Sequence, residues 1–236
     1  MRITLISDTH SKHKRIDQDL PGGDLIIHAG DVMNSGYVPS ELVDFCGWYD
    51  SLSQYNAQVF IAGNHDRMFE NLPEAAMQIV NSHKWITYLQ DSSMIYTTED
   101  LKQSCKIYGS PWQPEFRNWA FNLPRDGAKL ELKWAIIPPD TDILVTHGPA
   151  WGTGDMVMGE HDHLGCRLLA ERIHQIKPKI HVCGHIHSGR GYYFDGDTHH
   201  FNASILGERY TYDYEPFTFE WDQATNEIQF IKQQEQ

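Results

Sequence analysis

Five short motifs in this sequence combine Asp, Asn and His, which are side chains that bind divalent metals and transfer protons. In chain order they are a D-x-H triplet, a G-D pair, a G-N-H-D tetrad, an H-G pair and a G-H-x-H tetrad. The residues that they supply are Asp8, His10, Asp31, Asn64, His65, Asp66, His147, His185 and His187. Nitrogen and oxygen donors without thiolate suit Mn, Fe, Zn, Co or Ni, whereas Mg and Ca prefer oxygen alone.

Spacing within two of the motifs favours shared ligation. In extended backbone, residues two apart point to the same side, so Asp8 and His10 could hold one cation together. By the same argument, His185 and His187 could bind one cation or two adjacent ones. Alone, each motif is weak evidence, because a chain with 14 histidines contains such spacings by chance and a lone His147 is more often structural.

The G-N-H-D tetrad is more specific. Asn64 offers an amide oxygen to a metal or amide N–H groups to a phosphate. His65 stands next to Asp66, and a carboxylate can set the tautomer and basicity of an imidazole. The tetrad therefore combines a ligand with a proton-transfer group, although a polar loop that uses Asn64 and Asp66 in turns is the alternative.

Each motif directly follows a predicted strand. Runs rich in β-branched and apolar residues predict these five strands at 2–7, 24–28, 58–62, 142–146 and 179–183. Further strands are predicted at 106–108 and 199–202, with a terminal hairpin of 217–221 and 227–231 that turns at Asn226. Because ligands gather beyond the carboxyl ends of strands in open α/β sheets, we expect the five motifs to converge.

Three helices are predicted between the strands. One follows Ser40 as N-cap and buries Leu42, Phe45, Cys46 and Tyr49 on one face. The others span about 128–137 and 165–176. Alternation of strands and helices predicts an α/β fold, and the late hairpin suggests more than one sheet in a sandwich. The length fits a single domain over residues 1–236.

Composition excludes several classes of protein. The formal charge of −13, without a run of Lys and Arg, argues against an extended nucleic-acid partner. No apolar run reaches the roughly 18 residues of a membrane helix, and no signal peptide is recognised, so we expect a cytoplasmic protein with no membrane partner. The four cysteines form no close pair, which predicts reduced thiols.

The ordered set of five motifs, from Asp8 to His187, resembles the calcineurin-like metallophosphoesterase superfamily. The stretches 106–112, 119–125 and 177–184 resemble its metallophosphoesterase-domain-containing branch, which is similar to cyclic-nucleotide phosphodiesterases. Some vertebrate members of that branch carry Gly in place of His185 and are weak catalysts, whereas this chain keeps the histidine. The resemblance implies a four-layer α/β/β/α sandwich with mixed sheets.

The resemblance also implies roles for the motif residues. One cation would be held by Asp8, His10 and His187, and the second by Asn64, His147 and His185. Asp31 would bridge the two, and His65 would be the catalytic histidine with Asp66 as its orienting partner. Two cations about 3.5–4 Å apart clamp the attacking and leaving oxygens of a phosphate ester, and a metal-activated hydroxide is then the nucleophile.

The expected function is hydrolysis of phosphodiesters, cyclic nucleotides among them, or of small phosphomonoesters, with two divalent cations drawn from Mn, Fe, Zn, Co and Ni. The alternative is a nucleotide-binding regulatory metalloprotein with little turnover. In both, the partner is a small phosphate ester or nucleotide. Related folds often dimerise, so a homodimer stays open, although no apolar seam identifies one.

Other aromatic and histidine residues allow two interpretations each. Trp112, Phe116 and Trp151 follow predicted strand ends, where they would stack on a nucleobase or simply pack. His161 and His163 would line the mouth of the site or belong to a loop. Two histidines within strands, His28 and His181, are expected to be packed or hydrogen-bonded rather than ligating.

Overall fold

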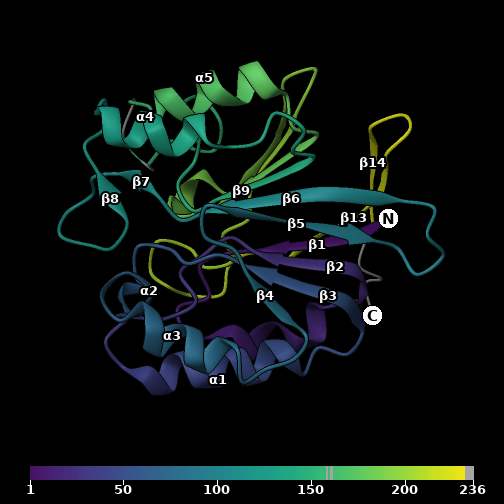
Figure 1. Cartoon of the computed structure of the whole chain (residues 1–236), viewed down its shortest axis with the longest axis horizontal. Helices are drawn as coiled ribbons and strands as arrows, with labels where there is room; N and C mark the ends of the chain where they lie inside the picture. Colours follow the sequence, from purple (N-terminus) through teal and green to yellow (C-terminus); the bar gives the residue numbers. More distant parts are fainter. Residues whose placement is uncertain (158, 160–161, 232–236) are drawn as a thin grey trace.

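The computed structural model describes residues 1–157, 159 and 162–231 and arranges them as helices, sheet, sheet and helices (Figure 1). The described part of the chain contains two six-stranded sheets and a small two-stranded one. The four-layer α/β/β/α sandwich expected from the sequence is confirmed.

The first sheet carries three of the five motifs. Its strand order is β14-β13-β1-β2-β3-β4. The parallel strands are β1 (Arg2–Ile6), β2 (Gly23–His28), β3 (Tyr55–Phe60) and β4 (Ile86–Tyr88). The antiparallel strands β13 (Phe217–Asp222) and β14 (Glu227–Phe230) extend the edge beside β1 and confirm the predicted terminal hairpin. Asn226 has a φ of 58° in the turn between them.

The second sheet carries the other two motifs, in the order β11-β12-β10-β9-β6-β5. Its parallel centre consists of β6 (Ser104–Ser110), β9 (Ile143–Thr146), β10 (Ile180–Cys183) and β12 (His199–Asn202). Antiparallel strands β5 (Ser92–Thr97) and β11 (Gly191–Phe194) form its edges. The small sheet pairs β7 (Gln113–Pro114) with β8 (Asn122–Leu123).

Helices cover the outer face of each sheet (Figure 1). The first sheet is covered by α1 (Pro39–Asp50), α2 (Arg67–Asn71), α3 (Pro73–Val80) and the 3₁₀ helix η1 (His13–Asp19). The second is covered by α4 (Ala128–Ala135) and α5 (Arg167–Ile176). A short 3₁₀ helix, η2 (His187–Gly189), follows β10.

The predicted N-cap of the first helix is wrong by two residues. The helix begins at Pro39 and its N-cap is Val38, which makes no side-chain cap. Proline is well suited to this position because its fixed φ is already helical and its missing N–H would have no partner there. The predicted buried face of Leu42, Phe45, Cys46 and Tyr49 is confirmed.

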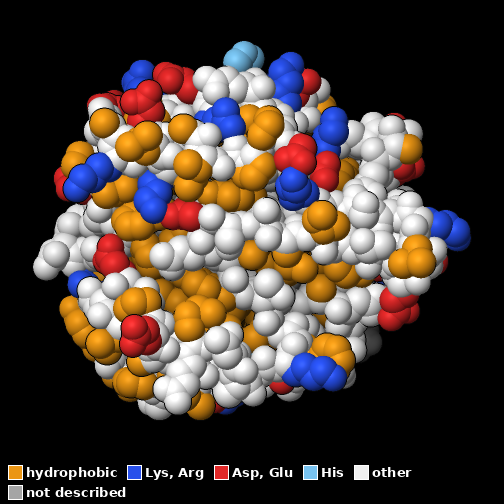
Figure 2. Space-filling model, viewed as in Figure 1, with side chains coloured by type: hydrophobic (Ala, Val, Ile, Leu, Met, Phe, Trp, Pro, Cys, Tyr) orange, Lys and Arg blue, Asp and Glu red, His pale blue; other side chains and the backbone are white. Residues whose placement is uncertain are grey.

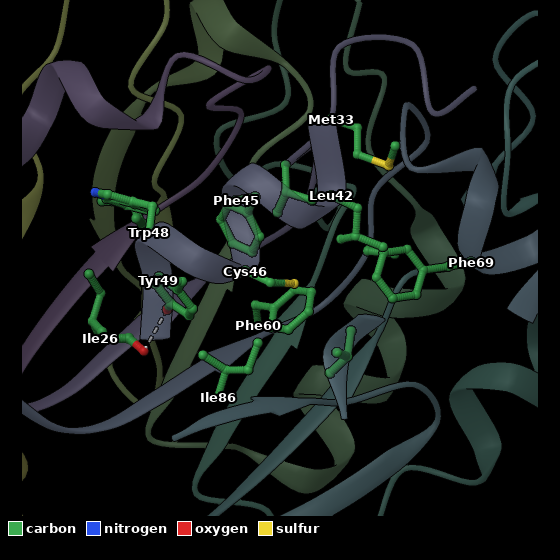
Figure 3. Packing of buried hydrophobic residues seen from close by; sticks show 14 of the residues in the cluster. Ile26, Met33, Leu42, Phe45, Cys46, Trp48, Tyr49, Phe60, Phe69 and Ile86 are labelled. Atoms are coloured by element: carbon green, nitrogen blue, oxygen red, sulfur yellow. Dashed lines mark hydrogen bonds between the residues drawn. The ribbon is translucent and has the colours of Figure 1, made fainter. Parts of the chain in front are cut away.

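Three apolar clusters fill the three spaces between the layers. On β2, Leu25 and Ile27 face the partner sheet, whereas Ile26 faces the helices. This alternation is what a strand buried on both faces requires. Figure 3 shows the helix-side cluster, where the hydroxyl of Tyr49 donates to the carbonyl of Ile26 at 2.9 Å and the Phe45 and Phe60 rings lie 5.3 Å apart. A third cluster packs α4 and α5 against the second sheet.

The helices and the surface charges indicate how the protein could meet a membrane or a nucleic acid. Among the described residues, no helix combines the length and the apolar character that a membrane crossing needs. On the face shown in Figure 2, Lys and Arg side chains alternate with Asp and Glu rather than gathering into one basic field.

Candidate metal centre and active site

The carboxyl ends of five strands meet at one edge of the sandwich and bring the motifs together. Asp8 and His10 follow β1, Asp31 follows β2, and the G-N-H-D tetrad follows β3. From the second sheet come His147 after β9, and then His185 and His187 after β10. Among the described residues, candidate ligand atoms lie within 4.8 Å of one another in three sets, which are Asp8–His10–His187, His10–Asp31–His65 and Asp8–Asp31–His147.

Several of these residues occupy the left-handed backbone region. The φ angles are 57° for Asp8, 42° for His10, 58° for Asp31 and 68° for His185. Such a conformation costs a non-glycine residue roughly 1–2 kcal/mol and persists only where neighbouring structure holds it. Here the amide of Asp8 donates to Gly30 O at 2.9 Å, and that of His10 donates to Asp31 O at 3.0 Å.

The extended geometry expected within the D-x-H and G-H-x-H motifs is therefore wrong. Asp8 and His10 lie in a left-handed turn, and His187 begins η2 rather than continuing a strand. The residues still converge, because candidate ligand atoms of Asp8, His10 and His187 lie within 4.8 Å of one another.

Asp31 lies between two groups of ligands. Its Oδ2 is 3.6 Å from His10 Nε2, and its Oδ1 is 3.4 Å from His147 Nε2. On one side, Asp8 Oδ1 lies 3.5 Å from His187 Nε2, and on the other, Asn64 Oδ1 lies 3.0 Å from His147 Nε2. Each carboxylate oxygen of Asp31 thus faces a different ligand group.

Buried atoms in this cluster fit a bound cation. Both ring nitrogens of His10 are buried and have no hydrogen-bond partner among the described residues, an arrangement that costs roughly 1–3 kcal/mol if nothing binds there. His147 Nδ1 donates to Ala29 O at 2.9 Å and His187 Nδ1 donates to Gly207 O at 3.0 Å. These bonds aim both Nε2 atoms inward, as in histidines that ligate metals.

Electrostatics in the cluster follow from burial and close opposite charges. Burial lowers the pKa of His10 to about 4 and that of His185 to about 3. Burial also acts to lower the pKa of His147, but the Asp31 carboxylate outweighs it and raises the value to about 9. For His187, burial is likewise outweighed, here by Asp8, and the pKa rises to about 9. A cation entering the site would have to displace those two protons.

His65 is held by a different partner from the one expected. Its Nδ1–H donates to the carbonyl of Asn34 at 2.6 Å, which leaves Nε2 free for the site. The ring of Trp119 stacks on it at 3.9 Å, while its backbone N–H donates to Asp31 Oδ1 at 2.7 Å.

Asp66 does not orient His65, so that expectation is wrong. The chain turns into α2 at Asp66, and its carboxylate points under the neighbouring loop. There it accepts the backbone N–H groups of Val32, Met33 and Gly63 at 2.7–3.2 Å. Burial, with a further contribution from the Asp31 carboxylate, raises the pKa of Asp66 to about 7. Its role is to fix the turns that carry Asp31 and Asn64.

A match with a known family covers all five motifs. The family described as calcineurin-like phosphoesterase matches residues 1–189. The chain belongs to this family. Metallophosphoesterase domain-containing protein 1 of Homo sapiens is 39% identical over an alignment of 236 positions, which covers 91% of this chain and 68% of that protein. The branch suggested by the sequence is thereby confirmed.

Solved structures support the fold of this calcineurin-like phosphoesterase. The protein TT1561 of Thermus thermophilus superposes with a TM-score of 0.63 at 14% identity, over 97% of each chain. Purple acid phosphatase PPD1 from yellow lupin superposes with a TM-score of 0.52 at 14% identity, over 93% of this chain and 49% of that one. At such identities the likeness concerns the fold alone.

Beside the candidate metal ligands of the phosphoesterase lies a cavity of about 320 Å³. His185 and His187 form part of its wall, Phe116 packs edge-on to His185 at 5.5 Å, and Tyr210 lies 5.1 Å from the His187 ring. Tyr210 is also 4.8 Å from the ring of His10. The cavity therefore joins the ligand cluster to an aromatic surface.

The other residues proposed for substrate contact lie elsewhere. Of the described residues, neither Trp112 nor Trp151 belongs to the cavity wall. Trp112 donates its indole N–H to Asp91 at 2.9 Å, and Trp151 packs 5.0 Å from His163. His163 in turn bonds Asp155 at 2.7 Å. His161 lies outside the described residues.

Two residues of the site escaped the sequence reasoning. Tyr210 belongs to an irregular stretch beyond β12 and does not directly follow a strand end, so no pattern marked it. Trp119 lies in one of the stretches that resemble the metallophosphoesterase-domain-containing branch, which was a signal for a relationship but not for contact with His65.

Proposed function

We propose that this protein is a two-metal phosphoesterase that hydrolyses phosphodiesters in preference to phosphomonoesters. The observation that carries the proposal is the position of Asp31, whose two oxygens face His10 and His147 at 3.6 and 3.4 Å. A carboxylate in this position can bridge two cations, one with Asp8, His10 and His187 and the other with Asn64, His147 and His185.

Bound divalent cations would polarise the phosphoryl oxygens and lower the pKa of an attacking water from 15.7 toward about 7. The chain supplies the remaining requirements. Its carboxylates and imidazoles bind and space the cations, while the Asn64 amide can donate to a phosphoryl oxygen. His65 Nε2 faces the site because Nδ1 is engaged by Asn34 O. When the His65 ring is protonated on both nitrogens, the proton on Nε2 can pass to the oxygen of the leaving group.

The cavity supports a substrate with a second ester group. Phe116 and Tyr210 flank the ligand cluster, where they can stack on an aromatic part of the substrate such as a nucleobase. Cyclic nucleotides and other small diesters meet this description, and Mn²⁺ suits the nitrogen and oxygen donors. A nucleotide-binding regulatory protein with little turnover is the second candidate, since the same walls could retain a nucleotide.

Hydrolysis of bis-p-nitrophenyl phosphate beside p-nitrophenyl phosphate separates these candidates. We expect metal-stripped protein reloaded with Mn²⁺ to cleave the diester faster, and EDTA to abolish the activity. Tight nucleotide binding without cleavage of either ester, in any of Mn, Fe, Zn, Co or Ni, would favour the regulatory protein.

A further inference from the structure

Two fully buried histidines occupy equivalent places in the two sheets. His28 ends β2 and pairs with Ile6 of β1, whereas His181 lies on β10 and pairs with Leu144 of β9. Both side chains point toward the outer helices rather than the space between the sheets, where their neighbours Ile27 and Val182 lie. Each histidine is therefore adjacent to a strand whose end carries metal ligands, without being a ligand itself.

The hydrogen bonds of His28 determine which ring nitrogen carries its proton. The backbone N–H of Gly30 can only donate, and it donates to His28 Nδ1 at 3.2 Å. With Nδ1 acting as an acceptor, the proton of the neutral ring is on Nε2. That nitrogen lies 3.0 Å from the hydroxyl of Thr9, so it donates to the residue between Asp8 and His10. Burial lowers the pKa of His28 to about 3, which keeps the ring neutral.

In the second sheet, the carboxylate of Asp195 determines where the ring protons lie. His200 Nε2 is 3.0 Å from Asp195 Oδ2, and because a carboxylate can only accept, Nε2 carries the proton of the neutral His200 ring. Burial lowers the pKa of His200, which keeps that ring neutral, so its Nδ1 accepts from His181 Nδ1 at 3.2 Å. His181 Nε2 is then bare and accepts from the Thr146 hydroxyl at 2.9 Å. These bonds hold Thr146, the residue directly before His147.

We propose that His28 and His181 are positioning residues of the metal centre, each fixing the ligand-bearing loop of its own sheet through a threonine hydroxyl. The loop at Thr9 needs such support because Asp8, His10 and Ser11 all have positive φ angles. The proposal deepens the two-metal function and rests on it. In the metal-free protein, the two histidines would hold the ligand side chains in the geometry that a cation needs.

The first test reads the tautomers directly. Long-range ¹H–¹⁵N spectra of imidazole-labelled, metal-stripped protein at pH 7 should show both rings neutral, with the proton on Nε2 in His28 and on Nδ1 in His181. A proton on Nδ1 of His28, or on Nε2 of His181, would overturn the inference for that sheet, because the bond to the threonine hydroxyl would then run in the other direction.

The second test measures Mn²⁺ affinity by calorimetry with the metal-stripped, full chain. Thr9→Val and His28→Leu should each weaken binding by about tenfold, at the low end of the 10–100-fold effects of groups that orient ligands. If the histidine acts through the hydroxyl, the double variant should also lose about tenfold rather than about a hundredfold. His28→Gln keeps a side-chain N–H and should recover part of the loss.

Thr4→Val is the matched control. Thr4 is buried on β1, and the partners of its hydroxyl are Tyr55 and Thr218 rather than a ligand loop. This variant should lower thermal stability and leave Mn²⁺ affinity unchanged. Equal loss of affinity in Thr4→Val and Thr9→Val, or wild-type affinity in His28→Leu, would overturn the proposal. Neither readout uses turnover, so an inactive wild-type protein would contradict only the proposed function.

Discussion

Replacement of Gly63 by alanine tests the packing of the metal centre without removing a ligand. The added Cβ would lie 2.3 Å from Asp31 Oδ1, 2.5 Å from Asp31 N and 2.6 Å from His147 Cε1. Real Cβ atoms essentially never approach closer than 3.0 Å, so Asp31 Oδ1 must move by at least about 0.7 Å, the difference between 3.0 and 2.3 Å. The added carbon would push apart the Asp31 carboxylate and the His147 ring.

The size of the effect follows from that displacement. A misplacement of about 1 Å in a catalytic constellation can reduce turnover on the order of 100-fold. Overpacking of a buried site lowers the free energy of unfolding by about 1–3 kcal/mol. We therefore expect Gly63→Ala to remain folded, to lose the second cation, and to hydrolyse bis-p-nitrophenyl phosphate about 100-fold more slowly.

The assay combines elemental analysis of Mn²⁺-reloaded protein with initial rates of diester hydrolysis. Gly47→Ala in α1 is the control, because its Cβ would meet no atom within 4 Å. That variant should keep both cations and gain up to about 1 kcal/mol in the free energy of unfolding, since alanine is the better helix former. Wild-type metal content and turnover in Gly63→Ala would refute the assigned geometry.

Three further predictions concern individual side chains. Asp31→Ala should lose the coupled metal pair, and two cations per chain in that variant would contradict the bridge. His65→Ala should keep both cations but lose on the order of 100-fold or more in kcat, so normal kcat would remove it from the catalytic role. Burial lowers the pKa of His13 to about 4 from its ordinary 6.5. The unfolded chain therefore binds the extra proton between these values, and stability should fall as the pH drops from 6.5 toward 4, by up to about 1.4 kcal/mol per pH unit. His13→Phe should make this pH dependence shallower in denaturant titrations, and an unchanged slope would disprove the assignment.

Strand ends and ligand types were predictable because both depend on local sequence. The runs before Asp8, Asp31 and His147 are apolar and β-branched, which indicates strands, and polar residues after them then meet at one sheet edge. The convergence of the motifs followed from this topology alone.

Backbone conformation at the site was not predictable by the same route. The left-handed φ angles of Asp8 and His10 contradict the extended geometry that their spacing suggests. Contacts between loops supply the energy for these turns, and such contacts leave no periodic pattern in the sequence. The bond from His65 to the Asn34 carbonyl is of the same kind, because any residue at position 34 presents a carbonyl.

In the proposed mechanism, hydrolysis requires two cations bridged by Asp31. Metal-stripped protein should be titrated with Mn²⁺ while the rate of bis-p-nitrophenyl phosphate cleavage is followed. We predict that the rate rises until two equivalents of Mn²⁺ are bound and then stays constant. Addition of EDTA should lower the rate to the background value. Full activity at one equivalent, or no cleavage with any of Mn, Fe, Zn, Co or Ni, would contradict the account.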